Sequence, residues 1–243
     1  MKIALVSDVH GNLEALDAVL FDIRERGIKE VVCLGDLVGY GANPNECVEL
    51  IRGLARPVIA GNHDWAVLGK TDYSNFNPVA RAAVEWTKNN TKGKNLEYLD
   101  CLDLVARITK ESVCLVHATP KKPEEWSYLF DLIDFREQFQ FFDEHICCIG
   151  HSHEPLFVQA KGASVRLVNE NPLSIQRDFR YIINVGSVGQ PRDLDSRASY
   201  AVIDADEQTA EIVRVTYDIP KAQNKIMTAG LPEFLAMRLA RGQ

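Results

Sequence analysis

Side chains that could bind metal ions follow several short apolar runs along the first two thirds of the chain. The set comprises Asp8, His10, Asp36, Asn62, His63, Asp64, His117, His151 and His153, and it includes five of the chain's six histidines. A mixture of carboxylate, imidazole and amide oxygen suits transition metals that support hydrolysis. Two such ions about 3.5–4 Å apart need a bridging carboxylate and roughly seven protein ligands. This set of nine supplies that number and leaves His63 and Asp64 over.

The spacing within two of these segments favours paired ligation. Alternate residues of an extended segment point to the same side. Asp8 and His10 are therefore expected to present two ligands together, as are His151 and His153. Glycines next to these residues leave room for tight turns at the strand ends; they are Gly11, Gly35, Gly61 and Gly150.

The elements that must position these residues alternate in type. Apolar runs predict strands at residues 3–6, 31–34, 57–60, 113–116 and 146–149. Helical spacing appears at 13–23, with Asn12 as a candidate N-cap and Gly27 as a stop, and again at 45–54. This alternation is typical of a βαβαβ sheet. Because ligands of such sheets bind beyond the carboxyl ends of the strands, the polar residues are expected to meet there.

The remaining segments predict additions to this sheet. The alternation lapses between residues 66 and 112, where helices at 79–87 and 96–102 indicate a helical insertion. Strands are expected at 156–159, 164–168, 181–185, 200–204 and 211–217. Few helices separate these strands, so antiparallel pairing is expected. A C-terminal helix from Pro220 should be interrupted near 230–232. We expect one domain, 1–243, of mixed α/β class.

Composition limits the class of protein. A chain of 243 residues, 46% of them hydrophobic, is large enough for one sizeable domain. A general nucleic-acid binder needs an excess of positive charge, whereas this chain has a net charge of −7. A nucleotide substrate bound by a few local cations stays open. The first apolar stretch is too short for a signal-peptide core, and no run approaches the ~18 residues of a membrane span. Cysteines inside apolar runs favour buried, reduced thiols and a cytoplasmic location; they are Cys33, Cys114, Cys147 and Cys148.

Taken singly, each candidate ligand has an ordinary structural explanation. An Asp such as Asp8 or Asp36 most often caps a helix or forms a turn. His117 alone would more often be a hydrogen-bonded core histidine than a ligand. Their number and order favour the metal site.

Two further residues are candidate substrate contacts. Arg192 has the side chain best suited to phosphate recognition, and Tyr40 closely follows Asp36. Residues 121–126 form either a rim loop that contacts substrate or a solvated loop anchored by Trp126. Asn184 and Ser187 are expected to form a turn near the site.

Five motifs give the sequence a family resemblance. They are Asp8-x-His10-Gly11, Gly35-Asp36-x-x-Gly39, Gly61-Asn62-His63-Asp64, the lone His117 and Gly150-His151-x-His153. In this order they resemble the calcineurin-like metallophosphoesterase superfamily. The segment 184–192 is similar to the small bacterial and archaeal phosphodiesterase-like members. The resemblance implies a four-layer αββα sandwich, with two mixed β-sheets flanked by helices.

The resemblance also implies roles for the candidate residues. The first metal would be bound by Asp8, His10 and His153, the second by Asn62, His117 and His151, and Asp36 would bridge them. His63 would be the general acid that protonates the leaving oxygen, and Asp64 would orient it. The implied activity is two-metal phosphoester hydrolysis, of phosphodiesters first, with a hydroxide between the metals as nucleophile. Mn²⁺ is the favoured metal, and Fe, Zn²⁺, Ni²⁺ and Mg²⁺ are the other candidates.

Other functions stay open at this point. The segment Gly35–Gly41 lacks the Arg of the protein-phosphatase branch, and Asp64 replaces its Glu, so a protein phosphatase is disfavoured. A phosphomonoesterase, a nucleotide pyrophosphatase or a nuclease would use the same ligands. A non-catalytic scaffold of this fold would not need His63. The expected partner is a small phosphoester or a nucleotide. The C-terminal helix is expected to pack either on the sheet of its own chain or on a second subunit in a homo-oligomer.

Overall fold

The first of two mixed sheets contains the N-terminal strand. The structure is a computed structural model that describes residues 1–74 and 76–243. The sheet has the order β2-β1-β10-β11-β8. Its strands are β1 (Lys2–Val6), β2 (Glu30–Cys33), β8 (Leu173–Ser174), β10 (Ala198–Asp204) and β11 (Thr209–Val215). β1 pairs with β2 in parallel, and the other pairs are antiparallel.

The second sheet has the order β3-β4-β5-β9-β6-β7. Its strands are β3 (Val105–Ile108), β4 (Val113–Val116), β5 (Ile146–Ile149), β6 (Leu156–Lys161), β7 (Ser164–Val168) and β9 (Arg180–Asn184). The central strands β4, β5 and β9 are parallel, and the outer pairs are antiparallel. The antiparallel pairing expected for the later strands is therefore confirmed for β6, β7, β10 and β11, whereas β9 is antiparallel to β6 but parallel to β5.

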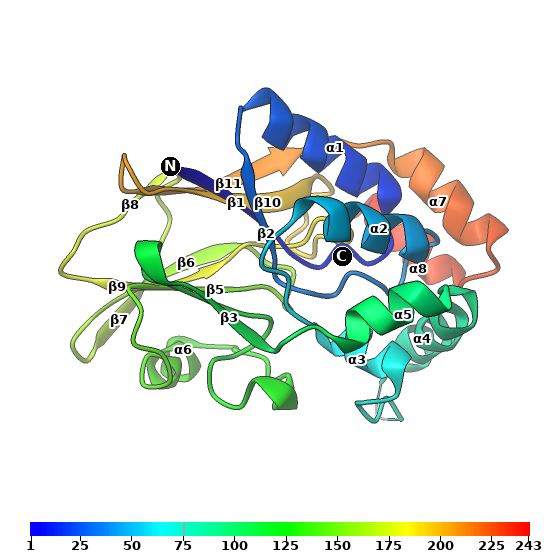
Figure 1. Cartoon of the computed structure of the whole chain (residues 1–243), viewed down its shortest axis with the longest axis horizontal. Coiled ribbons are helices and arrows are strands. Elements are labelled where there is room, and N and C mark those ends of the chain that lie inside the picture. The colour runs from blue at the N-terminus through cyan, green and yellow to red at the C-terminus, as the bar shows by residue number, and fades with distance from the viewer. Residues whose placement is uncertain (75) are drawn as a thin grey trace.

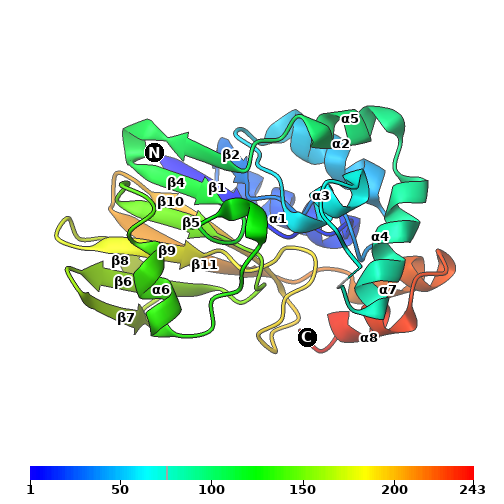
Figure 2. The same ribbon diagram turned by 90° about the horizontal axis from the view of Figure 1, so that it is seen from below.

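Helices cover the outer faces of the two sheets (Figure 1). They are α1 (Leu13–Glu25), α2 (Pro44–Leu54), α3 (Asn62–Leu68), α4 (Pro78–Asn90), α5 (Gly93–Asp100), α6 (Leu132–Gln138), α7 (Ile219–Thr228) and α8 (Glu233–Leu239), with 3₁₀ turns at Thr109–Glu111 and Pro123–Glu125. Helices α1 and α2 lie over the first sheet and α6 over the second. Figure 2 shows α3, α4, α7 and α8 gathered at one end of the sheets. None of the helices in the described ranges has the length and apolar character needed to cross a membrane.

Strand β1 shows how the layers are held together. Ala4 and Val6 face a cluster shared with α1 and α2, whereas Ile3 and Leu5 face the second sheet. This follows the two-residue period of a strand. A third cluster, with Phe135 of α6, packs on the other face of the second sheet. The four-layer αββα sandwich predicted from the sequence is confirmed.

Several predicted boundaries are also confirmed. The Asn12 side chain accepts a hydrogen bond from the Ala15 N–H at 3.2 Å and caps α1. Gly27 follows that helix with φ +69°. The break between α7 and α8 falls at residues 229–232, where an interruption was expected.

Three predictions about elements need correction. Residues 57–60 form an extended segment with isolated bridges to Cys33 and Asp103 rather than a full strand, and Pro57 has no N–H to donate. The region 66–112 is not wholly helical, because β3 at 105–108 belongs to the second sheet. The sequence also missed α3 and α6.

Parallel pairing brings the strand ends to one edge of the molecule. Val6 of β1 lies beside Cys33 of β2. In the second sheet, Ile149 of β5 lies beside Asn184 of β9. The residues that follow these strands are the predicted ligands, so the two sheets deliver them to one place.

Candidate metal centre

The structure brings all nine predicted residues into one buried cluster. Each of Asp8, His10, Asp36, Asn62, His63, Asp64, His117, His151 and His153 is buried. Asn62, His63 and Asp64 form the first turn of α3, and the others come from the loops after β1, β2, β4 and β5. Three groups have ligand atoms close enough to hold an ion: Asp8, His10 and His153; Asp8, Asp36 and His117; and His10, Asp36 and His63.

Three of the histidines are held in the same tautomer by backbone carbonyls. The Nδ1 atoms of His10, His117 and His153 lie 3.0, 2.7 and 2.6 Å from the carbonyl oxygens of Val38, Leu34 and Gln190. A carbonyl can only accept, so each Nδ1 carries the hydrogen and donates it. When the ring is neutral, its Nε2 then has a free lone pair, which is the arrangement of metal-binding histidines.

Those Nε2 atoms converge on two carboxylates. His10 Nε2 and His117 Nε2 lie 3.5 and 3.4 Å from Asp36 Oδ2. His153 Nε2 lies 3.2 Å from Asp8 Oδ1 and 3.1 Å from His10 Nε2. Metal–ligand bonds of about 2.1 Å place neighbouring ligands roughly 3.0–3.4 Å apart. The two distances at His153 match that spacing, and the third side of this group, from His10 Nε2 to Asp8 Oδ1, is 3.8 Å.

Atoms without partners at this site also fit a cation. Asp8 Oδ1 and His117 Nε2 are buried and have no hydrogen-bond partner among the described residues. Buried polar atoms are nearly always satisfied. Two facing lone pairs on His10 and His153 likewise need a positive charge between them. The residues present therefore fit a divalent metal ion.

Asn62 and His151 form a second part of the cluster. Asn62 Oδ1 lies 2.9 Å from His151 Nδ1, a distance that suits either a hydrogen bond or two ligands of one ion. His151 Nε2 is buried and, within the described part of the chain, has no partner. The ring of His151 lies 5.2 Å from that of His117, centroid to centroid.

Burial and the carboxylates set the protonation of the site. Burial lowers the pKa of His63 to about 4 and that of His151 to about 3, so both rings are neutral. His117 differs, because the carboxylates of Asp36 and Asp8 outweigh its burial and raise its pKa to about 9. The His117 proton thus balances charge in the metal-free protein, and a cation bound there would replace it.

The backbone at the site is strained. Asp8, His10, Asp36, His151 and His153 have φ of 52°, 48°, 53°, 65° and 64°. Residues other than glycine rarely occupy this left-handed region, and such strain concentrates at functional sites. The expectation of extended Asp-x-His and His-x-His segments was therefore wrong. Turns at the strand ends, rather than strand alternation, bring these side chains together.

At two glycines the backbone lies so close to the carboxylates of the site that no side chain fits. A Cβ on Gly61 would overlap the Asp36 carboxylate, and one on Gly150 would overlap the Ser7 hydroxyl and the Asp8 carboxylate. The structure thus gives a steric reason for glycine beside the two central carboxylates.

Asp64 does not orient His63 in this structure. Its carboxylate accepts four backbone N–H groups, those of Asp36 and Gly61 at 2.9 Å, Leu37 at 3.0 Å and Val38 at 3.3 Å. His63 Nδ1 has no hydrogen-bond partner among the described residues. Asp64 instead clamps the turn that presents Asp36 to the site, which corrects the predicted role.

His63 is positioned by packing. Its ring lies 4.9 Å from that of His10, 4.4 Å from that of Tyr40 and 5.5 Å from that of Phe76. A Cβ on Gly39 would lie only 2.6 Å from His63 Nδ1, so a glycine there makes room for the ring.

The two predicted substrate contacts lie at the edge of the cluster. The Arg192 guanidinium sits 5.8 Å from the centre of the Tyr40 ring, and the Tyr40 ring lies 4.6 Å from that of His10. Arg192 Nη2 donates to Gln190 Oε1 at 2.9 Å, while its buried Nε has no partner in the described ranges.

Asn184 and Ser187 form the expected turn near the site. The Asn184 amide donates to Gly150 O and Ser152 Oγ, both at 2.9 Å. Ser187 Oγ donates to Asp8 O at 2.8 Å. These bonds fix the turns that carry the ligands.

Sequence reasoning missed Tyr128, whose ring stacks on that of His151 at 4.2 Å. The available signal was the aromatic density of residues 126–130, WSYLF, which closely follow the candidate rim loop. Trp126 of that loop does lie near the cluster, with its ring 5.9 Å from that of His117.

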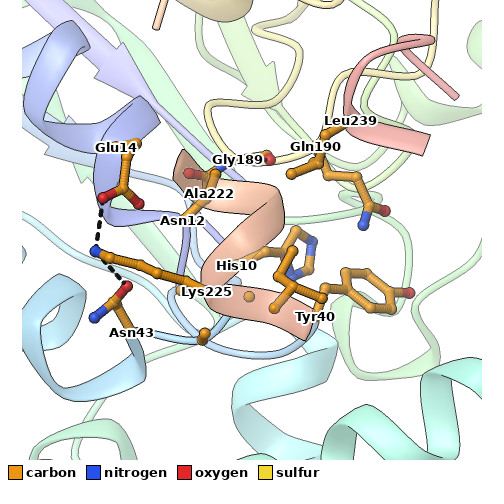
Figure 3. A pocket seen from close by; sticks show the side chains of 14 residues that line it. His10, Asn12, Glu14, Tyr40, Asn43, Gly189, Gln190, Ala222, Lys225 and Leu239 are labelled. Carbon is orange, nitrogen blue, oxygen red and sulfur yellow. Dashed lines mark hydrogen bonds and ion pairs between the residues drawn. The ribbon is translucent and has the colours of Figure 1, made fainter. Parts of the chain in front are cut away.

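An ion pair between a buried carboxylate and a half-buried lysine lies at the helical end of the molecule (Figure 3). Lys225 of α7 lies 2.6 Å from Glu14 Oε1 and donates to Asn43 Oδ1 at 3.0 Å. Glu14 lies in the first turn of α1 and Asn43 is the N-cap of α2, so both come just after the segments that carry His10 and Asp36. Helix α8 lies against α7, and its Leu235 and Leu239 share a buried apolar cluster with residues of α4 and α7.

Comparison with known proteins decides the family. The profile of the calcineurin-like phosphoesterase superfamily domain matches residues 1–208. The chain belongs to this superfamily. Membership makes it a metal-dependent phosphoester hydrolase by family, in agreement with a site that fits divalent metal. The resemblance read from the five motifs is confirmed.

Relatives match over nearly the whole length. An uncharacterized protein of Methanocaldococcus jannaschii is 49% identical over 244 residues, covering 99% of this chain and 98% of that protein. The crystal structure of a metallophosphoesterase from Sphaerobacter thermophilus is 41% identical with a TM-score of 0.88, covering 100% of this chain and 99% of that one. A hypothetical protein from Pyrococcus horikoshii shares the fold at 21% identity and a TM-score of 0.81, covering 100% and 98%.

Proposed function

We propose that the chain is a phosphodiesterase that works with two divalent metal ions, Mn²⁺ first among the candidates. The observation that carries the proposal is the set of converging ligand atoms without partners, Asp8 Oδ1 and His117 Nε2, beside the 3.1 Å pair of imidazole nitrogens. In the proposed assignment Asp8, His10 and His153 would hold one ion, Asn62, His117 and His151 would hold the other, and Asp36 would serve both.

Side chains of the protein would then bind the phosphate and protonate the leaving group. Two such ions supply neutralisation of phosphate charge and ionisation of water near neutral pH. Arg192 would donate to a phosphate oxygen, since its Nε has no partner in the described structure and guanidinium suits this geometry. His63 would give a proton to the leaving oxygen. An anionic phosphate beside its ring would raise its pKa from about 4 towards the working pH.

Two considerations support a diesterase over the alternatives. The segment 184–192, similar to that of small phosphodiesterase-like members, lines this site through Asn184 and Arg192. His63 is packed beside His10 at 4.9 Å, where a non-catalytic scaffold would not need it. Phosphomonoester and pyrophosphate hydrolysis would use the same ligands, so the substrate comparison must be made directly.

The test compares hydrolysis of bis-p-nitrophenyl phosphate and p-nitrophenyl phosphate by Mn²⁺-loaded protein. The diester is expected to be cleaved with the higher kcat/KM. His63→Ala should keep its metal and lose about 10²–10⁴-fold in kcat, the usual contribution of general acid catalysis. His145→Ala is the matched control, because the sixth histidine lies outside the cluster. A His63→Ala protein that cleaves the diester at the wild-type rate would remove His63 from the mechanism.

A further inference from the structure

A cavity adjoins the metal cluster on the side of the second sheet. It has a volume of about 530 Å³ and reaches from His151 to the segment before α6. Its apolar wall comprises Tyr128, Phe130, Phe135, Leu156 and Leu167. Sites for small organic ligands have volumes of about 300–1,000 Å³ and mostly apolar walls with a few polar groups. The cavity has the size and lining of such a site.

Aromatic rings run from the cluster into this cavity. The Tyr128 ring stacks on His151 at 4.2 Å and an interplanar angle of 29°. The Phe130 ring follows Tyr128 at 6.1 Å and 30°. Phe130 is nevertheless 86% exposed and Tyr128 46% exposed. This row of rings, from His151 through Tyr128 to Phe130, therefore ends in an aromatic surface that nothing in the described chain covers.

The backbone beside these rings is fixed in place. The Phe130 N–H donates to Asp134 Oδ2 at 2.8 Å. Asp131 Oδ1 accepts from Ile133 N and Asp134 N at 2.7 and 3.0 Å and caps α6. A preorganised segment loses little conformational entropy when a ligand binds, so this aromatic wall is suited to ligand binding.

We propose that the cavity binds a planar aromatic ring of the substrate, a nucleobase, and that the chain therefore acts on nucleotide phosphoesters. Arg192 and Ser152 line the same cavity beside His151, so a phosphate at the cluster and a base against Phe130 belong to one continuous site. The inference rests on the proposed function, because it places the ester phosphate at the metal cluster. It adds the substrate class, which the cluster itself does not specify.

The test uses adenosine 5′-monophosphate and ribose 5-phosphate, which share sugar and phosphate and differ in the base. Both are titrated into Mn²⁺-loaded protein by calorimetry and used as inhibitors of bis-p-nitrophenyl phosphate hydrolysis in initial-rate assays. Free phosphate is assayed in each mixture so that hydrolysis of the probe is recognised. The nucleotide should bind at least about tenfold more tightly, in line with the affinity that base–aromatic stacking adds.

The variant Phe130→Ala isolates the stacking surface. Its side chain is 86% exposed, so the substitution leaves the apolar core intact, and Phe21→Ala, with a ring 56% exposed on α1, is the matched control. Phe130→Ala should weaken nucleotide binding about fivefold or more and leave ribose 5-phosphate binding unchanged. Equal binding of the two probes, or equal loss for both, would overturn the inference.

The two proposals fail in different ways. Mn²⁺-dependent diester cleavage without any preference for the nucleotide would reject the base site and keep the phosphodiesterase. Absence of cleavage together with absence of binding by either probe would reject both. Preferential binding of the nucleotide, lost in Phe130→Ala, together with no hydrolysis of bis-p-nitrophenyl phosphate, would keep the base site and reject the catalytic proposal.

Discussion

The substitution Asp64→Asn tests whether Asp64 supports the turn that carries Asp36 or acts on His63. The carboxylate accepts four backbone N–H groups, two on each oxygen, and two of them belong to Asp36 and Gly61. An asparagine offers one carbonyl oxygen and one amino group of nearly the same shape. The amino group cannot accept, so two of the buried N–H groups lose their partner and face a donor instead.

The cost follows from those two hydrogen bonds. Burial and the neighbouring Asp36 raise the pKa of Asp64 to about 7, so the measurements are made at pH 8, where its carboxylate is charged. Bonds to a charged acceptor contribute about 1.5–3 kcal/mol each, and a buried donor left unpaired carries a further penalty. The free energy of unfolding of the metal-free protein should therefore fall by about 4 kcal/mol. For a chain of this size each kcal/mol lowers Tm by about 2–4 °C, so Tm should fall by about 8–16 °C. Metal affinity should fall about 10–100-fold, because Asp36 is no longer held in its turn.

Urea denaturation of the metal-free protein and calorimetric titration of Mn²⁺ measure both effects. The control is Asp178→Asn, which changes a 76% exposed carboxylate and should stay within about 0.5 kcal/mol of the wild type. The reasoning would be refuted by unchanged stability and metal affinity together with a lower kcat. That result would mean that Asp64 acts on His63 during turnover.

Two further substitutions probe the support of the site. In Gly150→Ala the new Cβ would overlap the Asp8 carboxylate and the Ser7 hydroxyl. Its affinity for Mn²⁺ should fall at least about tenfold in a titration. Gly53→Ala, in open space on α2, should bind metal normally and be about 0.5–1 kcal/mol more stable in urea; equal metal affinity in both variants would contradict the steric account. Lys225→Ala removes the 2.6 Å partner of the buried Glu14 carboxylate and leaves it only Lys221 at 3.2 Å. The free energy of unfolding should fall by about 1.5–3 kcal/mol in the same assay. Lys221→Ala, at a side chain that is 61% exposed, should cost less than about 1 kcal/mol, and similar losses in the two lysine variants would contradict the anchoring role of Lys225.

Much of the fold could be predicted because its signals are local. The apolar runs of β1, β2, β4 and β5 are short and end abruptly at polar residues, and Asn12 and Gly27 are ordinary helix signals. The convergence of the ligands followed from one topological rule, that such residues gather at the carboxyl ends of strands. The predicted ligands therefore did meet, although they lie far apart in sequence.

The parts that could not be predicted depend on tertiary contacts. The left-handed backbone of Asp8 and His153 is imposed by the surrounding turns and contradicts the extended conformation that sequence spacing favours. Asp64 lies next to His63 in sequence, which suggested a pair, but its carboxylate faces the other way, into the turn of Asp36. The role of Tyr128 depends on a loop whose position no local pattern encodes.

The most direct test of the two-metal proposal is a titration of metal-stripped protein with Mn²⁺. Bound metal per chain and hydrolysis of bis-p-nitrophenyl phosphate are measured on the same samples. We expect no hydrolysis before metal is added, and full activity when two ions are bound per chain. Two bound ions without hydrolysis, or hydrolysis by the stripped protein, would contradict the proposed phosphodiesterase mechanism.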